Sequence, residues 1–187
     1  MSSKSSSKSK PTAGAGEASG ELTHVDSKGH IRMVNIGDKE ITHRVCIARS
    51  EVHMAAATLA KIIDGEVPKG DVLATARLAG IQAAKRTGEW IPLAHPLPLD
   101  AVEVSLIPNP DGTVILIEAR AETHWRTGVE MEAMVAATAA GLTVYDMCKA
   151  IDRNISLQAT RLIQKSGGKS GTWTRPGEAG PETGKLA

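Results

Sequence analysis

Residues 127–149 read TGVEMEAMVAATAAGLTVYDMCK, and this pattern predicts one long helix. The middle of the helix is apolar nearly all round, and charged residues lie only near its two ends. A helix that is apolar on every side is buried on every side. Charged groups on such a helix are costly unless they are paired or used in chemistry. We therefore expect the fold to pack around the middle of this helix and the functional groups to lie at its ends.

The segments on either side of this helix alternate between strand and helix patterns. The expected strands are 31–36, 42–48, 101–107, 113–122 and 155–163. Helices are expected at 51–63 and 72–86, with Ser50 and Asp71 as their N-caps. Thr127 and Glu130 have the spacing of a capping box for the long helix. Three prolines make residues 89–100 a shaped loop rather than a helix or a strand.

The order of these elements is strand, two helices, strand, strand, helix, strand, which is a split β-α-β pattern. It predicts an α+β fold of the ferredoxin-like type, a sandwich whose antiparallel sheet carries helices on one face. The opposite face of such a sheet needs cover. For this alanine-rich chain we expect that cover to come from self-association.

The size and composition of the chain exclude several classes of protein. Its 187 residues fit one domain with a real core. A net charge of +1 and an aromatic content of 2% argue against a nucleic-acid partner, and the lack of a long apolar run argues against a membrane span. The two cysteines form no CxxC, and the six histidines have no tight ligand spacing. These patterns predict a reduced, cytoplasmic environment and no metal site.

Three regions are expected along the chain. Residues 1–20 are rich in Ser, Lys, Gly and Ala and predict a disordered arm. The arm has no apolar segment of a secretory signal, and its lack of arginine disfavours a transit peptide. Residues 21–171 hold the expected elements and form a single domain. Residues 172–187 are rich in Gly and Pro and predict a flexible tail.

The two ends of the long helix carry candidate functional groups. Asp146 and Lys149 share one helix face, where they form either an acid–base pair or an ordinary ion pair. At the other end, Glu130 has a role in the capping box, whereas Glu132 has no visible structural role. Glu132 and Asp146 lie about 21 Å apart along the helix axis at ~1.5 Å per residue. One reacting atom cannot touch both, and this favours a site shared between chains.

Further segments carry side chains suited to an anionic ligand. The glycine-rich loop 165–171, KSGGKSG, offers backbone N–H and ammonium groups to phosphate oxygens, although it is not a Walker A motif. Its alternative interpretation is a plain linker. Lys69 precedes a helix N-terminus, His95 lies in the proline-shaped loop, and Arg44 lies on a strand. Each of these three is either a ligand-binding group or an ordinary surface or turn residue.

Taken together, these segments resemble a known family. The resemblance rests on KGDV at 69–72, ATAR at 74–77, AGIQAAKRT at 79–87, IPL at 91–93, HPL at 95–97, TGVEMEA at 127–133, YDMCKA at 145–150 and KSGGKSG at 165–171. These sequences resemble those of cyclic pyranopterin monophosphate synthases, the second enzyme of molybdenum cofactor biosynthesis. The resemblance runs from about Leu22 to Gly171.

The resemblance implies a lyase that converts 3′,8-cyclo-7,8-dihydro-GTP to cyclic pyranopterin monophosphate and releases pyrophosphate. It implies no metal and no organic cofactor. It also implies a homo-hexamer, a trimer of dimers, with its sites between subunits, which agrees with the spacing along the long helix. The expected partner is therefore the small-molecule substrate, with no nucleic acid and no membrane, and the expected location is the cytoplasm.

The resemblance also implies roles for single residues. Asp146 matches the family's active-site acid, and Lys69 and Lys149 match its catalytic lysines. The implied substrate-binding and pocket residues are Leu93, Ala94, His95, Met131, Glu132, Arg44, Glu130 and Lys165. Ala94 stands where relatives often have cysteine, so no thiol chemistry is expected there. Trp125-Arg126 stands where many relatives have a small residue and lysine.

These roles suggest a mechanism. A triphosphate requires positive charge, and Lys69, Lys165, Lys169 and Arg44 are the available donors. Clustered cations lower one another's pKa, so we expect a lysine shifted toward its neutral form to exchange protons with the substrate. In this scheme Lys69 and Lys149 transfer protons, Asp146 orients Lys149, and His95 and Glu132 hold the purine-derived part. A non-catalytic nucleotide sensor and a structural hexamer with a vestigial pocket are the alternatives, since a fold does not choose a function.

Overall fold

The computed structural model describes residues 29–178, and the unit that begins at Met33 carries the fold. Its elements in chain order are β1 (Thr42–His53), α1 (Ala56–Ile63), α2 (Val72–Ala84), α3 (Thr87–Trp90), β2 (Ala101–Pro108), β3 (Val114–Trp125), α4 (Glu130–Cys148), β4 (Ser156–Ser166) and β5 (Trp173–Thr174). The expected arm at residues 1–20 lies outside the described residues, as do residues 179–187 of the expected tail. The domain boundaries therefore stay predictions.

The strands form one antiparallel sheet in the order β2-β3-β1-β4-β5. β1 pairs with β3 in continuous register, from Thr42 opposite Trp125 to His53 opposite Val114. β3 separates β1 from β2 and runs antiparallel to both, so β1 and β2 are parallel, as a split β-α-β unit requires. The predicted ferredoxin-like fold is confirmed. The edge strand β5 is an addition that the sequence pattern does not predict.

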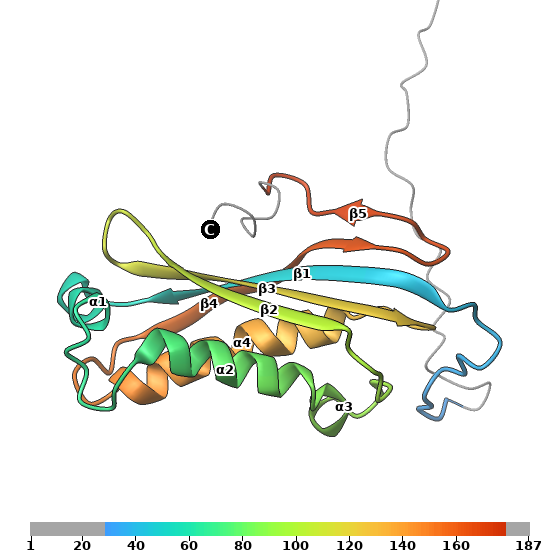
Figure 1. Ribbon diagram of the computed structural model, residues 1–187, viewed down its shortest axis with the longest axis horizontal. Helices are drawn as coiled ribbons and strands as arrows, with labels where there is room; N and C mark the ends of the chain where they lie inside the picture. The colour runs from blue at the N-terminus through green and yellow to red at the C-terminus, as the bar shows by residue number, and fades with distance from the viewer. Residues whose placement is uncertain (1–28, 179–187) are drawn as a thin grey trace, which may run out of the picture. The chain divides into compact units, whose positions relative to one another are not determined.

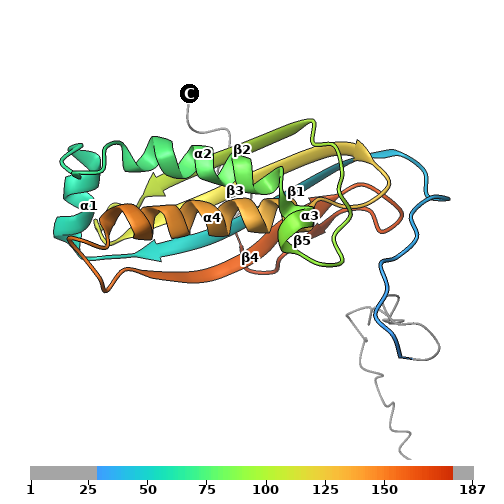
Figure 2. The same ribbon diagram turned by 90° about the horizontal axis from the view of Figure 1, so that it is seen from below.

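The helices cover one face of the sheet (Figure 1). Figure 2 shows α4 lying beside α2 in front of the sheet, with α3 near the N-terminal end of α4 and α1 near the C-terminal end of α4. The core lies between the two layers, where Val52 and Ile117 from the sheet and Ala136 and Ala140 from α4 are all fully buried. Small side chains on α4 let it approach the sheet closely, so the middle of the long helix is the centre of the fold, as predicted.

Two predictions about the first half of the chain are wrong. Residues 32–36 form no strand, and β1 continues to His53 instead of ending at residue 48. Ser50 does not cap a helix: it is fully buried inside β1, and its Oγ lies 2.9 Å from Oγ1 of Thr160 in β4. α1 begins only at Ala56. The physical reason is that β1 is paired on both sides, and this long-range pairing outweighs the local helical pattern.

The helix caps are partly as predicted. The Asp71 side chain caps α2 by accepting a hydrogen bond from the Ala74 N–H at 2.9 Å. The predicted capping box of α4 is wrong, because the helix begins at Glu130 with Val129 as its N-cap and no side-chain cap hydrogen bond. The side chain of Glu130 is therefore not used as a cap.

Candidate active site

Three charged side chains meet at the C-terminal end of α4. Asp146 lies in the last turn of the helix, and Lys149 is the C-cap residue. The Lys149 Nζ donates to Asp146 Oδ1 at 2.7 Å. The Lys69 Nζ, from the loop before α2, donates to Asp146 Oδ2 and to the Asp146 carbonyl oxygen, both at 2.8 Å. The structure therefore brings these three predicted residues together within one chain, and we call them the Lys-Asp-Lys cluster.

The Lys-Asp-Lys cluster is open to solvent and keeps its carboxylate charged. The Asp146 side chain is 57% exposed, and the hydrogen bonds from Lys149 and Lys69 lower its pKa to about 2. The hydrogen bond to Asp146 raises the pKa of Lys149 in turn. For Lys149 this is opposite to the shift expected from the sequence, because the hydrogen-bonded Asp146 carboxylate favours the charged form of the Lys149 ammonium group. Lys149 is therefore a proton donor in this state.

The loop that carries Lys69 is held on both sides of that residue. Val67 is buried in the core, and its carbonyl accepts a hydrogen bond from the Gly70 N–H at 3.0 Å. Gly70 has a φ of +98°, a backbone conformation that favours glycine. Asp71 then caps α2. Lys69 thus lies in a tight turn between two fixed points, and this turn directs its side chain to Asp146.

A second group of charged residues lies at the N-terminal end of α4. The Lys165 Nζ of β4 lies 3.7 Å from Glu130 Oε1 and 3.0 Å from Ser170 Oγ. Glu132 is only 4% exposed. Burial raises its pKa to about 7, and the neighbouring Glu130 carboxylate contributes to the increase. A carboxyl group that changes charge near neutral pH is suited to bind a ligand or to exchange a proton with it.

A cavity of about 650 Å³ lies next to this second group, and we call it the cationic cavity. Its wall is formed by Lys39, Glu40, Thr42, Arg44, Arg126, Thr127, Gly128, Gly168, Lys169 and Ser170. The Arg44 Nε donates to the Trp125 carbonyl oxygen at 2.9 Å. Within residues 29–178, the Arg126 Nε and the Thr42 Oγ1 are buried without a hydrogen-bond partner. Cationic groups and unsatisfied donors in one wall suit an anionic ligand.

His95 lies in the proline-shaped loop before β2. Its Nε2 lies 2.7 Å from the Val34 carbonyl oxygen. A carbonyl oxygen can only accept, so Nε2 carries a proton and Nδ1 is the nitrogen left for a ligand. The other predicted substrate-binding residues outside the acidic group, Leu93, Ala94 and Met131, are all partly buried.

The two charged groups lie at opposite ends of α4. Glu132 and Asp146 are separated by about 21 Å along the axis at ~1.5 Å per residue. The structure brings together Lys69, Asp146 and Lys149 at one end, and Arg44, Glu130 and Lys165 near the other. It does not join the two sets within one chain.

Sequence patterns do not identify every residue of the cationic cavity. Thr42 and Lys39 lie in a segment without a recognisable motif, and the burial of Thr42 depends on its partner strand. In the sequence, Arg126 is distinctive only because many relatives have lysine at this position. Its position between the end of β3 and the glycine before α4 is a signal that could have identified it, because such turns commonly bind anions.

These features define an α+β protein of the ferredoxin-like type with an acid–base cluster at one end of its central helix and a cationic cavity at the other. Comparison with known proteins then identifies its family. The sequence model of the MoaC family matches residues 33–168, and the chain belongs to this family.

Curated relatives named cyclic pyranopterin monophosphate synthase match most of the chain. The protein of Chloroflexus aurantiacus is 54% identical over 160 residues, which cover 86% of this chain and 98% of the relative. That of Thermomicrobium roseum is 56% identical over 155 residues, covering 83% and 93%. That of Pelotomaculum thermopropionicum is 54% identical over 157 residues, covering 84% and 92%.

No helix among residues 29–178 is long and apolar enough to cross a membrane. The same residues contain no group of three or more His, Cys, Asp or Glu side chains arranged to hold a metal ion. Cys46 and Cys148 are both free and buried, and burial raises the pKa of Cys46 to about 12. Its thiol is therefore a packing group rather than a nucleophile.

Proposed function

We propose that this protein is a cyclic pyranopterin monophosphate synthase, which converts 3′,8-cyclo-7,8-dihydro-GTP to cyclic pyranopterin monophosphate and pyrophosphate. The observation that carries the proposal is the Lys-Asp-Lys cluster, with two ammonium groups 2.7 and 2.8 Å from one carboxylate. It occurs in a chain whose relatives bear that enzyme's name. An ionised carboxylate that holds two proton donors has the chemistry of general acid–base catalysis.

The triphosphate of the substrate binds, in this proposal, in the cationic cavity. Arg44, Arg126 and Lys169 line the cavity, and Lys165 lies beside it. Their charges offset those of the phosphates and allow a ribose-derived hydroxyl to attack the α-phosphate while pyrophosphate leaves. The purine-derived part is held by His95 through Nδ1 and by the Glu132 carboxyl, with Leu93, Ala94 and Met131 around it.

Lys149 enters the proposed reaction as an acid. The raised pKa of Lys149 and the lowered pKa of Asp146 keep both groups charged in the free enzyme. Asp146 holds the two ammonium groups in place, and either lysine can then protonate a ring nitrogen or a hydroxyl of the substrate. The neutral amine that results is the base for the next proton transfer.

We propose that the active form is a homo-hexamer, a trimer of dimers, with sites between subunits. The separation of about 21 Å along α4 supports this assembly, because one reacting centre cannot reach both charged groups of one chain. A site shared between chains joins the Lys-Asp-Lys cluster of one subunit to the cationic cavity of its neighbour. The helical layer also exposes Leu78, Trp90 and Leu142 to 56%, 52% and 49%, which gives a second copy an apolar surface to bury.

The test of the function is incubation of the purified chain with freshly made cyclised GTP. Pyrophosphate is assayed directly, and the pterin product is oxidised to its fluorescent form. We expect both products in equal amounts, and none from GTP itself, which lacks the additional ring bond. Binding of cyclised GTP without release of pyrophosphate would overturn the proposal.

The rival function is a non-catalytic nucleotide sensor. A sensor needs a cationic cavity but has no use for a carboxylate between two lysines at the far end of α4, so the Lys-Asp-Lys cluster favours the enzyme. Saturable binding without turnover would favour the sensor, and no saturable binding at all would favour a purely structural hexamer. We place the enzyme in the cytoplasm, with which two free buried cysteines are compatible.

A further inference from the structure

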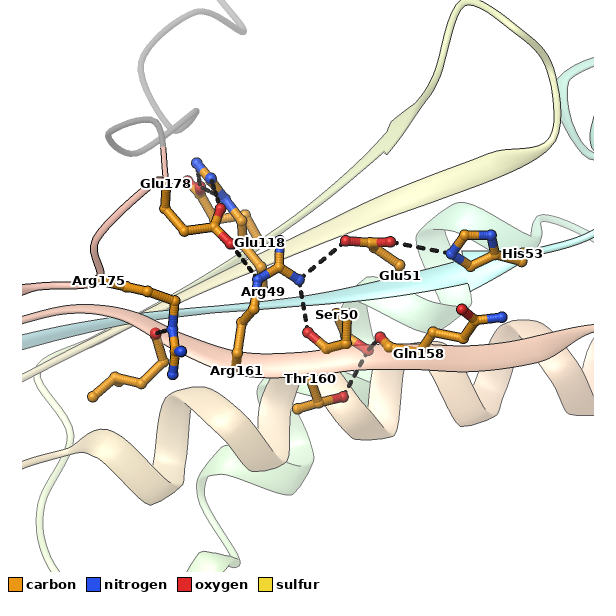
Figure 3. A network of polar contacts seen from close by, with 12 residues as sticks. Arg49, Ser50, Glu51, His53, Glu118, Gln158, Thr160, Arg161, Arg175 and Glu178 are labelled. Carbon is orange, nitrogen blue, oxygen red and sulfur yellow. Dashed lines mark hydrogen bonds and ion pairs between the residues drawn. The ribbon is translucent and has the colours of Figure 1, made fainter.

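The sheet face opposite the helices carries a network of charged side chains that the proposed reaction does not use (Figure 3). Arg49 of β1 and Glu118 of β3 are 4% and 0% exposed, and the Arg49 Nη2 lies 2.8 Å from Glu118 Oε2. Glu178 joins this pair, with its Oε2 3.2 Å from Arg49 Nη1 and its Oε1 paired with the Arg161 Nε. Arg161 also binds Glu51 at 3.0 Å. Charges that are this well buried are strongly destabilising when a partner is removed.

Glu178 lies at the end of a segment that folds back along β4, and we call residues 172–178 the C-terminal strap. Its only regular structure is the short strand β5, which pairs with the end of β4. After β5, the Arg175 N–H donates to the Ile163 carbonyl oxygen at 2.8 Å, and the Arg175 Nε donates to the Leu162 carbonyl oxygen at 2.7 Å. A strand of two residues is too short to hold a segment by its own ladder. The C-terminal strap therefore depends on its side-chain contacts.

The glycine-rich loop, residues 165–171, joins β4 to the C-terminal strap. Gly167 and Gly168 have φ values of +92° and +69°. A Cβ on Gly167 would collide with the His43 backbone, and one on Gly168 would collide with the Arg44 guanidinium. The loop thus packs directly on the start of β1, where it contributes part of the wall of the cationic cavity. The loop connects β4, which pairs with β1 along most of its length, to the strap, which joins the sheet only through the two residues of β5. The position of the loop therefore depends on how firmly the strap is held.

We propose that Glu178 is a positioning residue for the ligand of the cationic cavity. By pairing with Arg49 and Arg161, Glu178 fixes the C-terminal strap on the sheet, and the strap in turn holds the glycine-rich loop closed against Arg44. The inference rests on the proposed function for the identity of the ligand, the triphosphate of cyclised GTP. Glu178 itself lies on the opposite face of the sheet from the helices and touches no group assigned to the reaction.

The geometry explains why Glu178, rather than another acidic residue of the network, has this role. Glu178 is the acidic partner of two arginines on different strands, β1 and β4, and it belongs to the strap. Arg161 and then Arg49 hold the pKa of its carboxyl below the ordinary value, so the pairing is charged at neutral pH. Glu51 binds the same Arg161 on the same face but belongs to β1, which the sheet holds on both sides.

The kinetic test compares Glu178→Gln with the matched control Glu51→Gln. Each variant removes one negative charge from a partner of Arg161, but only the first releases the strap. We expect Glu178→Gln to raise the KM for cyclised GTP by about tenfold with kcat within about twofold, since the loop acts on binding and not on the chemical step. Glu51→Gln should leave both constants as in the wild type. An unchanged KM in Glu178→Gln, or an equal rise in both variants, would overturn the inference.

Hydrogen exchange supplies a second measurement that does not need turnover. In the free protein, the amides of residues 167–171 should exchange at least about tenfold faster in Glu178→Gln than in the wild type or in Glu51→Gln. In the wild type, inorganic pyrophosphate should slow exchange in the glycine-rich loop and in the strap together. If pyrophosphate protects the loop but not the strap of the wild type, the inference is overturned. This result does not depend on whether the variant folds. A wild type that does not turn over cyclised GTP would remove the proposed function, while these exchange rates would still decide the coupling of strap and loop.

Discussion

Burial decides how the two acidic residues at the ends of α4 behave. Glu132 is 4% exposed, and the loss of solvation raises its pKa to about 7. Asp146 is 57% exposed between two ammonium groups, and their hydrogen bonds lower its pKa to about 2. The pKa values of these two carboxyl groups on one helix are therefore shifted in opposite directions. In the proposed reaction this gives one group that changes charge near neutral pH and one that stays ionised.

The raised pKa of Glu132 predicts a pH-dependent stability. In the unfolded chain the carboxyl loses its proton near 4.5, whereas in the folded state it keeps the proton up to about 7. The free energy of unfolding therefore falls as the pH rises between these values, by about 3 kcal/mol. Glu132→Gln removes this dependence. The melting temperature of the variant should therefore rise relative to that of the wild type as the pH is raised through this interval. Thermal unfolding of both proteins over a pH series measures this difference. The same change in melting temperature with pH in both proteins would contradict the raised pKa of Glu132.

The position of Asp146 predicts a loss of catalysis without a loss of fold. Asp146→Asn keeps the shape of the side chain but removes the charge that holds the two lysines, so kcat should fall by about a hundredfold or more. The melting temperature should stay near that of the wild type, because the cluster is open to solvent. The control is Asp64→Asn, which changes an exposed carboxyl at the C-cap of α1 and should keep the wild-type kcat.

The lowered pKa of Asp146 also fixes the sign of its pH dependence. Stability from this carboxylate is fully present above the ordinary value of 3.8 and is lost only as the pH falls through about 2. The protonation of Asp146 should therefore cause no change in the reaction rate near neutral pH. A kcat for Asp146→Asn close to that of the wild type would remove the residue from the proposed mechanism.

At the scale of elements, glycine residues lie at two close contacts of α4 with its neighbours. A Cβ on Gly80 of α2 would lie 2.8 Å from the Ala136 carbonyl oxygen of α4. A Cβ on Gly141 of α4 would lie 2.8 Å from Cδ2 of Leu157 in β4. The first obstacle is backbone, which cannot move without shifting a helix. The second is the end of a flexible side chain, which can turn away.

These contacts predict different costs for the same substitution. Alanine in place of glycine normally stabilises a helix by about 1 kcal/mol. Gly80→Ala should nevertheless destabilise the protein by about 1–3 kcal/mol, because α2 must move away from α4. Gly141→Ala should change the stability by less than about 1 kcal/mol, since the repacking of Leu157 offsets the gain in helix propensity. Chemical denaturation of both variants measures the difference, and equal effects would contradict this account of the packing.

At the scale of the whole molecule, the proposed function requires assembly for the two charged groups to act together. The Lys-Asp-Lys cluster and the cationic cavity lie at opposite ends of α4, and no contact joins them within the described part of one chain. A closed oligomer brings different surfaces of identical subunits together, and such a site needs one half from each of two chains. The proposed hexamer is thus a condition for the proposed activity.

A shared site predicts that two inactive variants restore each other. Lys69→Ala damages the Lys-Asp-Lys cluster, and Arg44→Ala damages the cationic cavity, so each protein alone should be inactive. In co-expressed mixed oligomers, about a quarter of the sites combine two undamaged halves, so activity should return to that fraction. The matched control is Lys69→Ala with Asp146→Asn, two changes in the same half-site, which should stay inactive together. Failure of the first mixture to recover would contradict a site between subunits.

The successes and errors of sequence interpretation follow the range of the interactions. The order of elements, the long helix and the Asp71 cap depend on periodicity and on residues a few positions apart, so they were predictable. The extension of β1 to His53, with Ser50 buried inside it, depends on pairing with β3 and β4, which lie far along the chain. The strand β5 has the same origin. Local patterns contain no information about such partners.

The sequence by itself determined the fold class, the burial of α4 and, through the family resemblance, the identity of the charged residues near its ends. Only the tertiary structure decided which of them meet. It brought the Lys69 side chain into contact with Asp146, 77 positions further along the chain. It also gave Glu132 and Asp146 opposite pKa shifts. Finally, it formed the cationic cavity, whose wall includes Arg126 and Thr42. The reason is physical: contacts between distant segments and the solvation of each group are set by packing, which no short stretch of sequence specifies.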